Sequence, residues 1–520
     1  MNHLVITPIL LPLLTGVLLL FLRPFAIDLR RLLSLVAVIV QIGLAIMLLT
    51  KSGNGDILTY ALGGWAPPYG IVLVADRLAV WMLLITSLLA VFALLHALRG
   101  YDIKGRHFHV LFQLQLFGLN GAFLTGDLFN LFVFFEVLLL ASYGLLLHGG
   151  GRLRTRAGLH FVVINLAGST LFLFAAGTLY GVLGTLNMAD LARQISVLPA
   201  EHLGPVKAAG LMLFGVFALK GALLPLHLWL PAAYANTSAP VAALFAIMTK
   251  VGAYSILRID TLIFGSTAGA LAGMIDVWLL PLALLTLLVG MLGVLAASAL
   301  RQQIAYLVVA SVGSLLIAFA LGSSAGIAAG LYYLPHATFA AGAFFLLADV
   351  ISSRRGETDD RLQAGVLLTD RRFLGGVFFV LAILIAGMPP LSGFIGKWLT
   401  LQAAITHPWM PWILTVTLLT SLLAIIALAR TGSVLFYCAE VATAENDNLP
   451  TAALFPELLP AGALMLLCLA LTVWAGDVDE FARATAAQLL QPEDYMRAVL
   501  GSVQSAIAEP SLASTSELAP

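Results

Sequence analysis

Charged side chains are scarce in this sequence of 520 residues. They make up 10% of it, whereas 61% of the residues are hydrophobic and the mean hydropathy is +1.02. Soluble globular domains carry about 25% charged residues, so this composition excludes one and indicates a polytopic membrane protein. The 26 basic and 26 acidic residues cancel, which leaves no basic surface for nucleic acid and no acidic tract for a cationic partner.

Cysteine is almost absent as well. Cys438 and Cys468 stand in separate apolar runs, without a CxxC motif or a Cys/His cluster. Metal sites, iron–sulfur clusters and disulfide frameworks need such groupings. We therefore expect no metal, no cofactor and no redox centre in this chain.

Long apolar runs fill most of the sequence. One crossing of a bilayer takes about 20 apolar residues, and this criterion predicts an all-α fold with about 14 transmembrane helices. The predicted spans are residues 3–22, 32–50, 72–98, 108–125, 128–147, 157–183, 206–234, 241–260, 275–299, 303–321, 325–350, 374–405, 410–437 and 453–475. After Trp474 the sequence becomes polar, and we expect a surface helix followed by a disordered end.

Basic residues divide the connecting segments into two sets. They cluster after odd-numbered spans, whereas the segments after even-numbered spans hold mostly glycine, proline and acids. Because positive charge in short loops marks the cytoplasmic side, both termini are expected outside. We interpret the arginine clusters as topology signals rather than as binding sites.

One apolar stretch, residues 211–234, has a lysine in its middle. It reads LMLFGVFALKGALLPLHLWLPAAY and contains Lys220, then Pro225, His227 and Pro231. The helical neighbours of Lys220 are apolar, so its ammonium group needs water or a partner on another helix. A lysine at the bilayer centre costs about 2.5–3.5 kcal/mol and faces the bundle interior, and a proline frees backbone carbonyls. The stretch predicts a midplane ion site on a broken helix.

A second broken helix is expected in the twelfth span. The segment LAILIAGMPPLSGFIGKWLTLQ has Pro389 and Pro390 as its break, with Lys397 shortly after it. Broken, charged spans at matching places of two halves, in opposite orientations, indicate inverted repeats with a site between them. The predicted domains are N-terminal helices one to three (1–107), a first five-helix repeat (108–260), a second, inverted repeat (261–440), helix 14 (441–475) and a polar tail (476–520).

Polar groups inside the predicted membrane region suggest a relay. They are Glu136, Lys220, His227, Lys250, His336 and Lys397. Carboxylate, ammonium and imidazole groups spaced through a bundle can pass protons through intervening water, as in pumps. Static ion pairs that hold helices together are the alternative. Asp127, just before the fifth span, is interpreted as a helix N-cap.

Three segments carry a resemblance to a known family. They are FFEVLLLASYG with Glu136, FALKGALLPLHLWLPAAYANTSAPVAALFAIMTKVGAYSILR with Lys220 and Lys250, and MPPLSGFIGKWL with Lys397. Over about residues 60–440 the chain resembles the antiporter-like subunits shared by respiratory complex I, membrane-bound hydrogenases and Mrp-type multisubunit Na⁺/H⁺ antiporters. The segment YALGGWAPPYGIVLVADRLAVWM looks most like the D subunits of the Mrp type.

The resemblance implies roles and partners. Glu136 and Lys220 would form a pair, Lys250 would continue a hydrophilic axis and Lys397 would end it. The resemblance also implies a hetero-oligomer of six or seven subunits in a bacterial plasma membrane, exchanging external protons for internal Na⁺ or related cations.

Three positions depart from the family pattern. Ala340 stands where many complex I relatives have a lysine. Before the tenth helix, Arg301 stands at a lysine position and Gln302 at the arginine position that follows it. The sequence therefore has fewer basic side chains there than the family pattern, and the relay must rely on His336, Tyr332 or Tyr333, and water.

Two transport functions remain open from the sequence. One is a proton-translocating subunit of a monovalent cation (Na⁺)/proton antiporter, and the other is a proton-pumping arm of a complex I-like NADH-quinone oxidoreductase or hydrogenase. A membrane scaffold with purely structural charges is the third possibility. None of these makes this chain itself an enzyme. Glu136 is the only acid deep in a predicted span, so we expect the cation path to lie mainly in a partner or at a shared interface.

Overall fold

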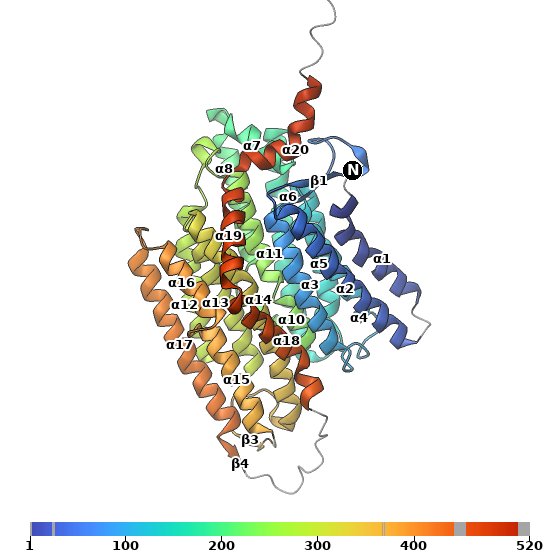
Figure 1. The fold of residues 1–520 in the computed structure, drawn as a ribbon, viewed down its shortest axis with the longest axis vertical. Coiled ribbons are helices and arrows are strands. Elements are labelled where there is room, and N and C mark those ends of the chain that lie inside the picture. The colour runs from blue at the N-terminus through green and yellow to red at the C-terminus, as the bar shows by residue number, and fades with distance from the viewer. Residues whose placement is uncertain (1–2, 23–25, 367, 369, 441–453, 508–520) are drawn as a thin grey trace, which may run out of the picture.

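The computed structural model describes residues 3–22, 26–366, 368, 370–440 and 454–507. Its helices form an elongated bundle (Figure 1). In the described residues eleven helical segments are long and apolar enough to cross a membrane, and two shorter apolar helices, Thr7–Phe21 and Phe108–Leu124, accompany them. The predicted helical, polytopic membrane fold is confirmed at this level.

The N-terminal part contains a strand pair that the apolar pattern did not predict. Its elements are η1 (His3–Val5), α1 (Thr7–Phe21), α2 (Ile27–Ser52), β1 (Leu58–Ala61), η2 (Leu62–Gly64), β2 (Val72–Ala75) and α3 (Arg77–Ala97). β1 and β2 pair antiparallel, so the predicted start of the third span at residue 72 is wrong. The side chain of Asp76 accepts a hydrogen bond from Ala79 N, and this cap begins the helix only after the strand.

The middle of the chain carries the first broken helix. Its elements are α4 (Phe108–Leu124), α5 (Leu128–Leu147), α6 (Arg152–Leu183), α7 (Met188–Ser196), η3 (Ala200–His202), α8 (Leu203–Lys220), α9 (Trp229–Asn236), α10 (Ala239–Phe245), α11 (Met248–Arg258), the π-helix η4 (Ile259–Ile263) and η5 (Gly269–Leu271). Asp127 caps α5 by accepting from Asn130 N at 2.8 Å, which confirms the predicted N-cap.

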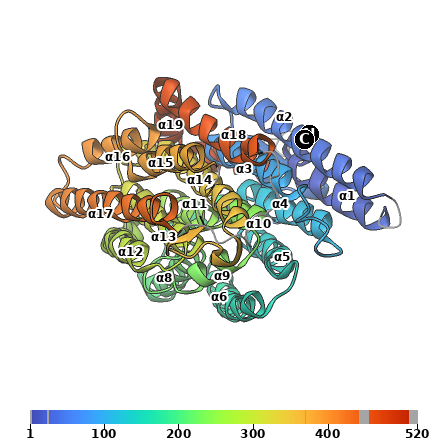
Figure 2. The ribbon, with the colours of Figure 1, turned by 90° about the horizontal axis from the view of Figure 1, so that it is seen from below.

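The second half carries the other broken helix. Its elements are α12 (Asp276–Ala296), α13 (Leu300–Phe319), α14 (Ser324–Arg354), η6 (Gly356–Thr358), β3 (Gly365–Val366), α15 (Arg371–Ala386), α16 (Ser392–Ala403), α17 (Met410–Phe436) and β4 (Ala439–Glu440). α14 lies in the middle of the bundle (Figure 2), and all its residues from 326 to 351 are buried.

Both predicted breaks lie between helices, with one correction. The first separates α8 from α9 and contains Pro225; the second separates α15 from α16 and contains Pro389 and Pro390. Pro231 is not a break, because it is the third residue of α9, where a missing backbone N–H leaves no intrahelical bond unmade.

The C-terminal part differs from the expected surface helix. Its elements are α18 (Leu454–Val473), α19 (Ala475–Leu489) and α20 (Pro492–Ile507). α19 packs along α14 and buries Ala482, Thr485 and Ala486, so its small residues make a contact surface inside the bundle. α20 lies against α7 and β1 (Figure 1). The expected disordered end, residues 508–520, lies outside the described residues.

Connecting segments meet in two groups. Segments after even-numbered spans contact each other, as in the backbone bridge between Leu73 and Thr125. Segments after odd-numbered spans do the same, as in the ion pair between Arg31 and Asp102. In Figure 1, β1, α7 and α20 lie at one end of the bundle and β3 and β4 at the other.

Candidate functional site

Lys220 is the last residue of α8, directly before the first break. Its side chain is 8% exposed, and its Nζ donates to Asn165 Oδ1 on α6 at 3.0 Å. A cavity of about 20 Å³ lies against both residues and Trp229. One water needs roughly 10–15 Å³ of this kind of volume, so the cavity has room for about one. The end of α8 thus presents a buried ammonium group to an amide and a water-sized space.

Glu136 does not contact Lys220 directly. Its Oε1 accepts a hydrogen bond from Ser169 on α6, and no ion pair joins Glu136 to Lys220, both of which are described. Asn165 and Ser169 are four residues apart on α6 and so face the same side. The structure thus shows no direct ion pair between the two groups, and each is hydrogen-bonded to one of two α6 residues that lie one turn apart. Glu136 is also partly exposed.

Lys250 lies in the centre of the bundle on α11. It is fully buried, and its Nζ donates to Ser311 Oγ on α13 at 3.3 Å. Gly252 allows α11 to pack closely on the end of α8, since a Cβ at Gly252 would overlap the backbone nitrogen of Gly221. This close approach puts the helix that carries Lys250 against the break that follows Lys220.

Lys397 on α16 and His336 on α14 both contact the helix ends that flank the second break. Lys397 Nζ donates to the carbonyl oxygen of Ala386 at 2.7 Å, the last residue of α15, and to Ser421 Oγ at 2.8 Å. His336 Nδ1 lies 2.9 Å from Ser392 Oγ, at the start of α16. The backbone carbonyl at the end of α15 is thus a partner of Lys397, and the hydroxyl of Ser392 at the start of α16 is a partner of His336.

A cavity joins these groups from different helices. Its walls include Ser311, Tyr333, His336 and Lys397, and its volume is about 40 Å³. That volume accommodates roughly three waters. Because Ser311 is also the partner of Lys250, the cavity connects the surroundings of Lys250 with His336 and Lys397. Ala340 lies in its wall as well, at the position where the sequence lacks the family's lysine.

The structure distinguishes between the two candidate tyrosines and leaves His227 apart. Tyr333 lines the cavity, whereas the hydroxyl of Tyr332 donates to the backbone oxygen of Leu471. His227 lies in the first break, 6% exposed, and among the described residues its Nδ1 has no hydrogen-bond partner. His227 is therefore not joined to Lys220 or Lys250 by a direct contact.

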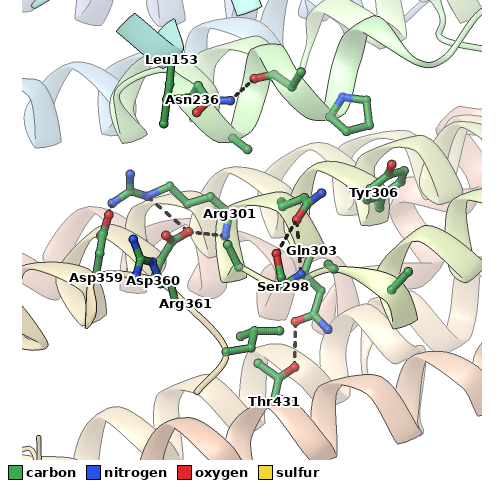
Figure 3. A pocket seen from close by; sticks show the side chains of 18 of the residues that line it. Leu153, Asn236, Ser298, Arg301, Gln303, Tyr306, Asp359, Asp360, Arg361 and Thr431 are labelled. Carbon is green, nitrogen blue, oxygen red and sulfur yellow. Dashed lines mark hydrogen bonds and ion pairs between the residues drawn. The ribbon is translucent and has the colours of Figure 1, made fainter. Parts of the chain in front are cut away.

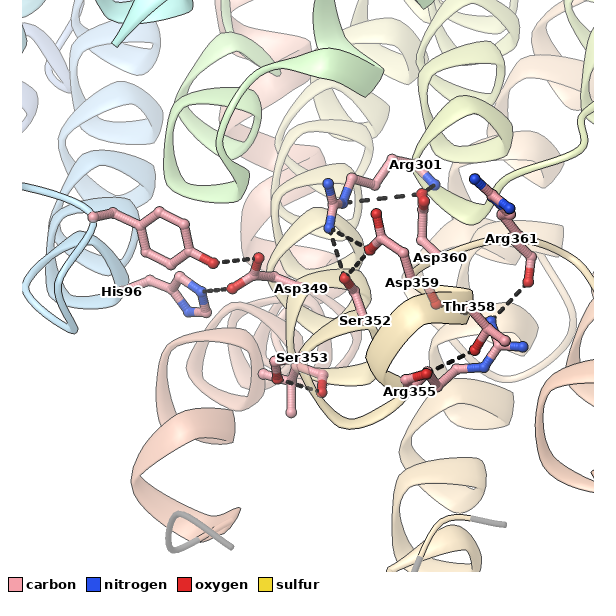
Figure 4. Close-up of polar contacts among 12 residues, drawn as sticks. His96, Arg301, Asp349, Ser352, Ser353, Arg355, Thr358, Asp359, Asp360 and Arg361 are labelled. Carbon is pink, nitrogen blue, oxygen red and sulfur yellow. Dashed lines mark hydrogen bonds and ion pairs between the residues drawn. The ribbon is translucent and has the colours of Figure 1, made fainter. Parts of the chain in front are cut away.

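Arg301 belongs to a separate polar cluster at the end of the bundle that carries β3. It pairs with Asp359 and Asp360 and donates to Ser352 Oγ at 2.8 Å (Figure 4). One turn before Ser352, the buried Asp349 lies 3.0 Å from His96 Nε2. Asp349 is thus a buried acid on a long helix, near the end of α14, whereas Glu136 is only partly buried.

The partners of the titratable groups were not predicted from the sequence. They are Asn165, Ser169, Ser311, Ser392 and Ser421. On α6 an amide and a hydroxyl stand four residues apart, but the same span also contains His160, Thr170 and Thr178, so the pattern alone does not single them out. In the described residues no group of three or more His, Cys, Asp or Glu side chains could hold a metal ion. The lysine amines, the imidazole of His336 and the carboxylate of Glu136 can bind and release protons, and the two cavities have room for water beside them.

Comparisons with known proteins identify the family. Residues 125–424 match the family model described as NADH:quinone oxidoreductase/Mrp antiporter, TM. The chain is 38% identical to the D subunit of the probable K(+)/H(+) antiporter of Rhizobium meliloti (strain 1021), covering 96% of this chain and 98% of the relative. It is 37% identical to the D subunit of the Na(+)/H(+) antiporter of Bacillus subtilis (strain 168), covering 96% and 100%.

A solved structure agrees with these relatives. One chain in the structure of the Mrp complex from Dietzia sp. DQ12-45-1b superposes with a TM-score of 0.85 at 28% identity, covering 96% of this chain and 100% of that one. The chain therefore belongs to the family of Mrp antiporter D subunits, among the antiporter-like membrane subunits that include those of NADH:quinone oxidoreductases, and it is a transporter subunit rather than an enzyme.

Proposed function

We propose that this chain translocates protons within a multisubunit monovalent cation/proton antiporter of a prokaryotic cell membrane. The observation that supports this most is the cavity of about 40 Å³ between His336, Lys397 and the Lys250 partner Ser311. It puts titratable groups from separate helices around a space large enough for water. Static ion pairs would not need such a space, because they fill it with their own side chains.

The proposed route has four parts. In the first part, a proton passes between Glu136 and Lys220 along the α6 face that carries their partners Ser169 and Asn165. Lys250 follows across the close contact of α11 with the end of α8. The cavity then connects Lys250 with His336 and finally with Lys397. The gaps between hydrogen-bonded groups are bridged by water, which passes protons between groups that are too far apart for direct transfer.

We propose that the two halves are inverted repeats within 14 crossings. In support, α4 packs on α5 as α12 packs on α13, and α6 packs on α8 as α14 packs on α16. Each half also has a broken helix with a lysine close to its break. The repeats comprise residues 108–260 and 261–440, preceded by helices one to three (1–107) and followed by helix 14 (441–475) and the polar tail (476–520). Both termini lie outside, by the distribution of arginine.

The transported cation is Na⁺, K⁺ or a related monovalent ion. The two relatives are named for Na⁺ and for K⁺, and the structural neighbour belongs to a complex, so this chain works with other subunits, six or seven in all. The lysines of the route repel a metal cation. We therefore infer that the cation crosses mainly in a partner subunit or at a shared interface.

The test uses inverted membrane vesicles that contain the whole complex. A proton gradient is set up with ATP or a respiratory substrate, and Na⁺ or K⁺ is added while a fluorescent dye reports the gradient. Cation-dependent loss of the gradient, absent from vesicles without the complex, is expected. If no cation dissipates the gradient, but oxidation of NADH or hydrogen by the complex pumps protons, the redox-driven function replaces the antiporter.

A further inference from the structure

A cavity of about 1320 Å³ opens at the end of the bundle that carries β3. Figure 3 shows side chains that line it. Its walls come from the start of α6, from α9, from the turn between α12 and α13, from residues 359–363 and from α17. These segments are far apart in the sequence, so the cavity is a feature of the assembled bundle. Its wall does not include Glu136, Lys220, Lys250, His336 or Lys397. The cavity therefore has no role in the proposed proton route.

The charges in its wall are unbalanced. Five arginines face two aspartates: Arg152, Arg154, Arg301, Arg361 and Arg430 against Asp359 and Asp360. Both aspartates are held by one arginine, since Arg301 Nη2 lies 3.3 Å from Asp359 and Arg301 N donates to Asp360 at 2.9 Å (Figure 3). Arg154 donates to the backbone oxygens of Asn236 and His148.

Three arginines remain after these contacts. Within the described part of the chain, the guanidinium groups of Arg152, Arg361 and Arg430 have no hydrogen-bond or ion-pair partner. They come from α6, from the segment before β3 and from α17, and all three line the cavity. Guanidinium groups bind the oxygens of phosphate in a fork-like geometry. All three residues are exposed, and their guanidinium groups in the wall of one cavity can meet a phosphate group that enters it.

Other parts of the wall are apolar. They contain Leu153 and Leu228, which are 70% and 65% exposed, together with Leu295 and Val434. A free phosphate ion would leave these side chains and most of the volume uncovered. A phospholipid covers both kinds of wall, because its phosphodiester headgroup reaches the arginines while its glycerol and upper acyl chains lie on the leucines. Basic pockets between transmembrane helices on the cytoplasmic side bind anionic headgroups in this way.

We propose that this cavity binds an anionic phospholipid of the cytoplasmic leaflet, whose phosphodiester group is held by Arg152, Arg361 and Arg430. The choice of leaflet rests on the proposed orientation of the chain, and the binding itself does not. The arginine clusters that mark the cytoplasmic side thus include a binding site, contrary to their interpretation as topology signals alone. Occupation of the cavity links α6, α17 and the segment before β3, which belong to both proposed repeats.

The experiment compares lipid binding by the purified complex. The test variant is Arg152→Gln/Arg361→Gln/Arg430→Gln, and the matched control is Arg371→Gln/Arg372→Gln, which removes exposed charges near the same end without touching the cavity. Each complex is stripped of lipid with detergent and then exposed to phosphatidylglycerol, to phosphatidylcholine or to inorganic phosphate. Bound lipid is counted by native mass spectrometry. Single-arginine variants replace the triple one if that complex does not assemble.

The wild type and the control are expected to retain phosphatidylglycerol at least tenfold better than the triple variant and to show little preference for phosphatidylcholine. Millimolar inorganic phosphate is expected not to displace the lipid. Equal retention by the triple variant and the wild type would overturn the proposal. So would displacement of the lipid by inorganic phosphate, which would make the ligand a free anion, or cross-linking of Arg430→Cys to an acidic segment of a neighbouring subunit, which would make it a docking surface.

Discussion

Lys220 and Glu136 are connected through one face of α6 and not by direct contact. The ammonium group donates to Asn165 at 3.0 Å, the carboxylate accepts from Ser169, and the two α6 residues are one turn apart. A direct ion pair would hold both charges strongly and slow the release of a proton. Neutral partners leave each group free to change its protonation state, so the arrangement suits transfer better than anchorage.

The first prediction concerns Asn165, the partner of Lys220. Asn165→Ala removes the hydrogen bond to the buried ammonium group, which costs about 1–3 kcal/mol, or roughly 5- to 150-fold in an equilibrium. We expect cation/proton exchange to fall within that range while the complex still assembles. The measurement is the exchange rate in inverted vesicles, with the amount of complex determined by immunoblot.

The matched control for Asn165 is Thr170→Ala on the same helix. Thr170 is exposed and bonds only to the backbone oxygen of Leu166. Its removal should leave exchange unchanged. Equal loss of exchange in both variants would mean that α6 acts through its general stability, and would remove Asn165 from the route.

The second prediction concerns the volume of the cavity between His336 and Lys397. Ala340 lines this cavity, and Ala340→Leu fills space that water occupies in the proposed route. Exchange should drop at least tenfold. Ala343→Leu is the control, since Ala343 lies on the same helix, is fully buried and does not line the cavity. Both substitutions overpack the bundle by about 1–3 kcal/mol, so equal loss of activity in the two variants would refute the role of the cavity.

The third prediction concerns the pH dependence of stability near Asp102, in the segment between α3 and α4. Burial alone would raise the pKa of this carboxyl group, but hydrogen bonds from His109 and Arg31 outweigh it and lower the pKa to about 2. A lowered pKa means that the stabilisation is complete above the unfolded value of about 3.9 and is lost as the pH falls toward 2. Thermal unfolding of the purified complex between pH 6 and pH 3 should show this loss.

Asp102→Asn is the matched variant for this titration. It should unfold at lower temperature than the wild type at pH 6, and the difference should shrink as the pH falls below 4. A difference that stays constant from pH 6 to pH 3 would show that the ionised carboxylate is not the source of the stabilisation.

The fourth prediction concerns the buried ion pair between Arg258 and Asp76. Arg258 donates to both carboxylate oxygens, at 2.5 and 2.9 Å, and both residues are under 5% exposed. Removal of one partner leaves a buried charge and costs about 3–5 kcal/mol. We expect Asp76→Leu to reduce assembly of the complex on native gels. The double variant Asp76→Leu/Arg258→Met should recover part of it, and a double variant that assembles worse than the single one would contradict this view of the pair.

The sequence was sufficient to predict the charged groups of the proposed route, but not to predict their hydrogen-bond partners. Lys220, Lys250 and Lys397 were identifiable because a charge in an apolar run has few structural explanations. Ser311 and Ser421 were not, since serines are common in membrane helices and only the packing of distant helices makes them partners. A pair of Glu136 with Lys220 was expected from the resemblance, and the sequence does not reveal that Ser169 and Asn165 on α6 are their hydrogen-bond partners.

The prediction of helix and strand boundaries from the sequence was limited in the same way. The four apolar residues of β2 fit the start of a helix as well as a strand, and the pairing with β1 decides between them. The polar sequence of α19 predicts a surface helix, whereas its small residues pack on α14. The break after Lys220 was predictable, since a proline interrupts a helix through its own backbone and needs no contact with a distant segment.

The central claim is that Lys220 carries protons, and its most direct test is exchange by the complete complex with Lys220→Ala. Lys207→Ala is the control, because Lys207 is an exposed lysine on the same helix. Inverted vesicles with equal amounts of assembled complex are energised, and Na⁺ or K⁺ is added. We predict that Lys220→Ala abolishes cation-dependent loss of the proton gradient while Lys207→Ala retains it. Normal exchange by an assembled Lys220→Ala complex would contradict the proposed route.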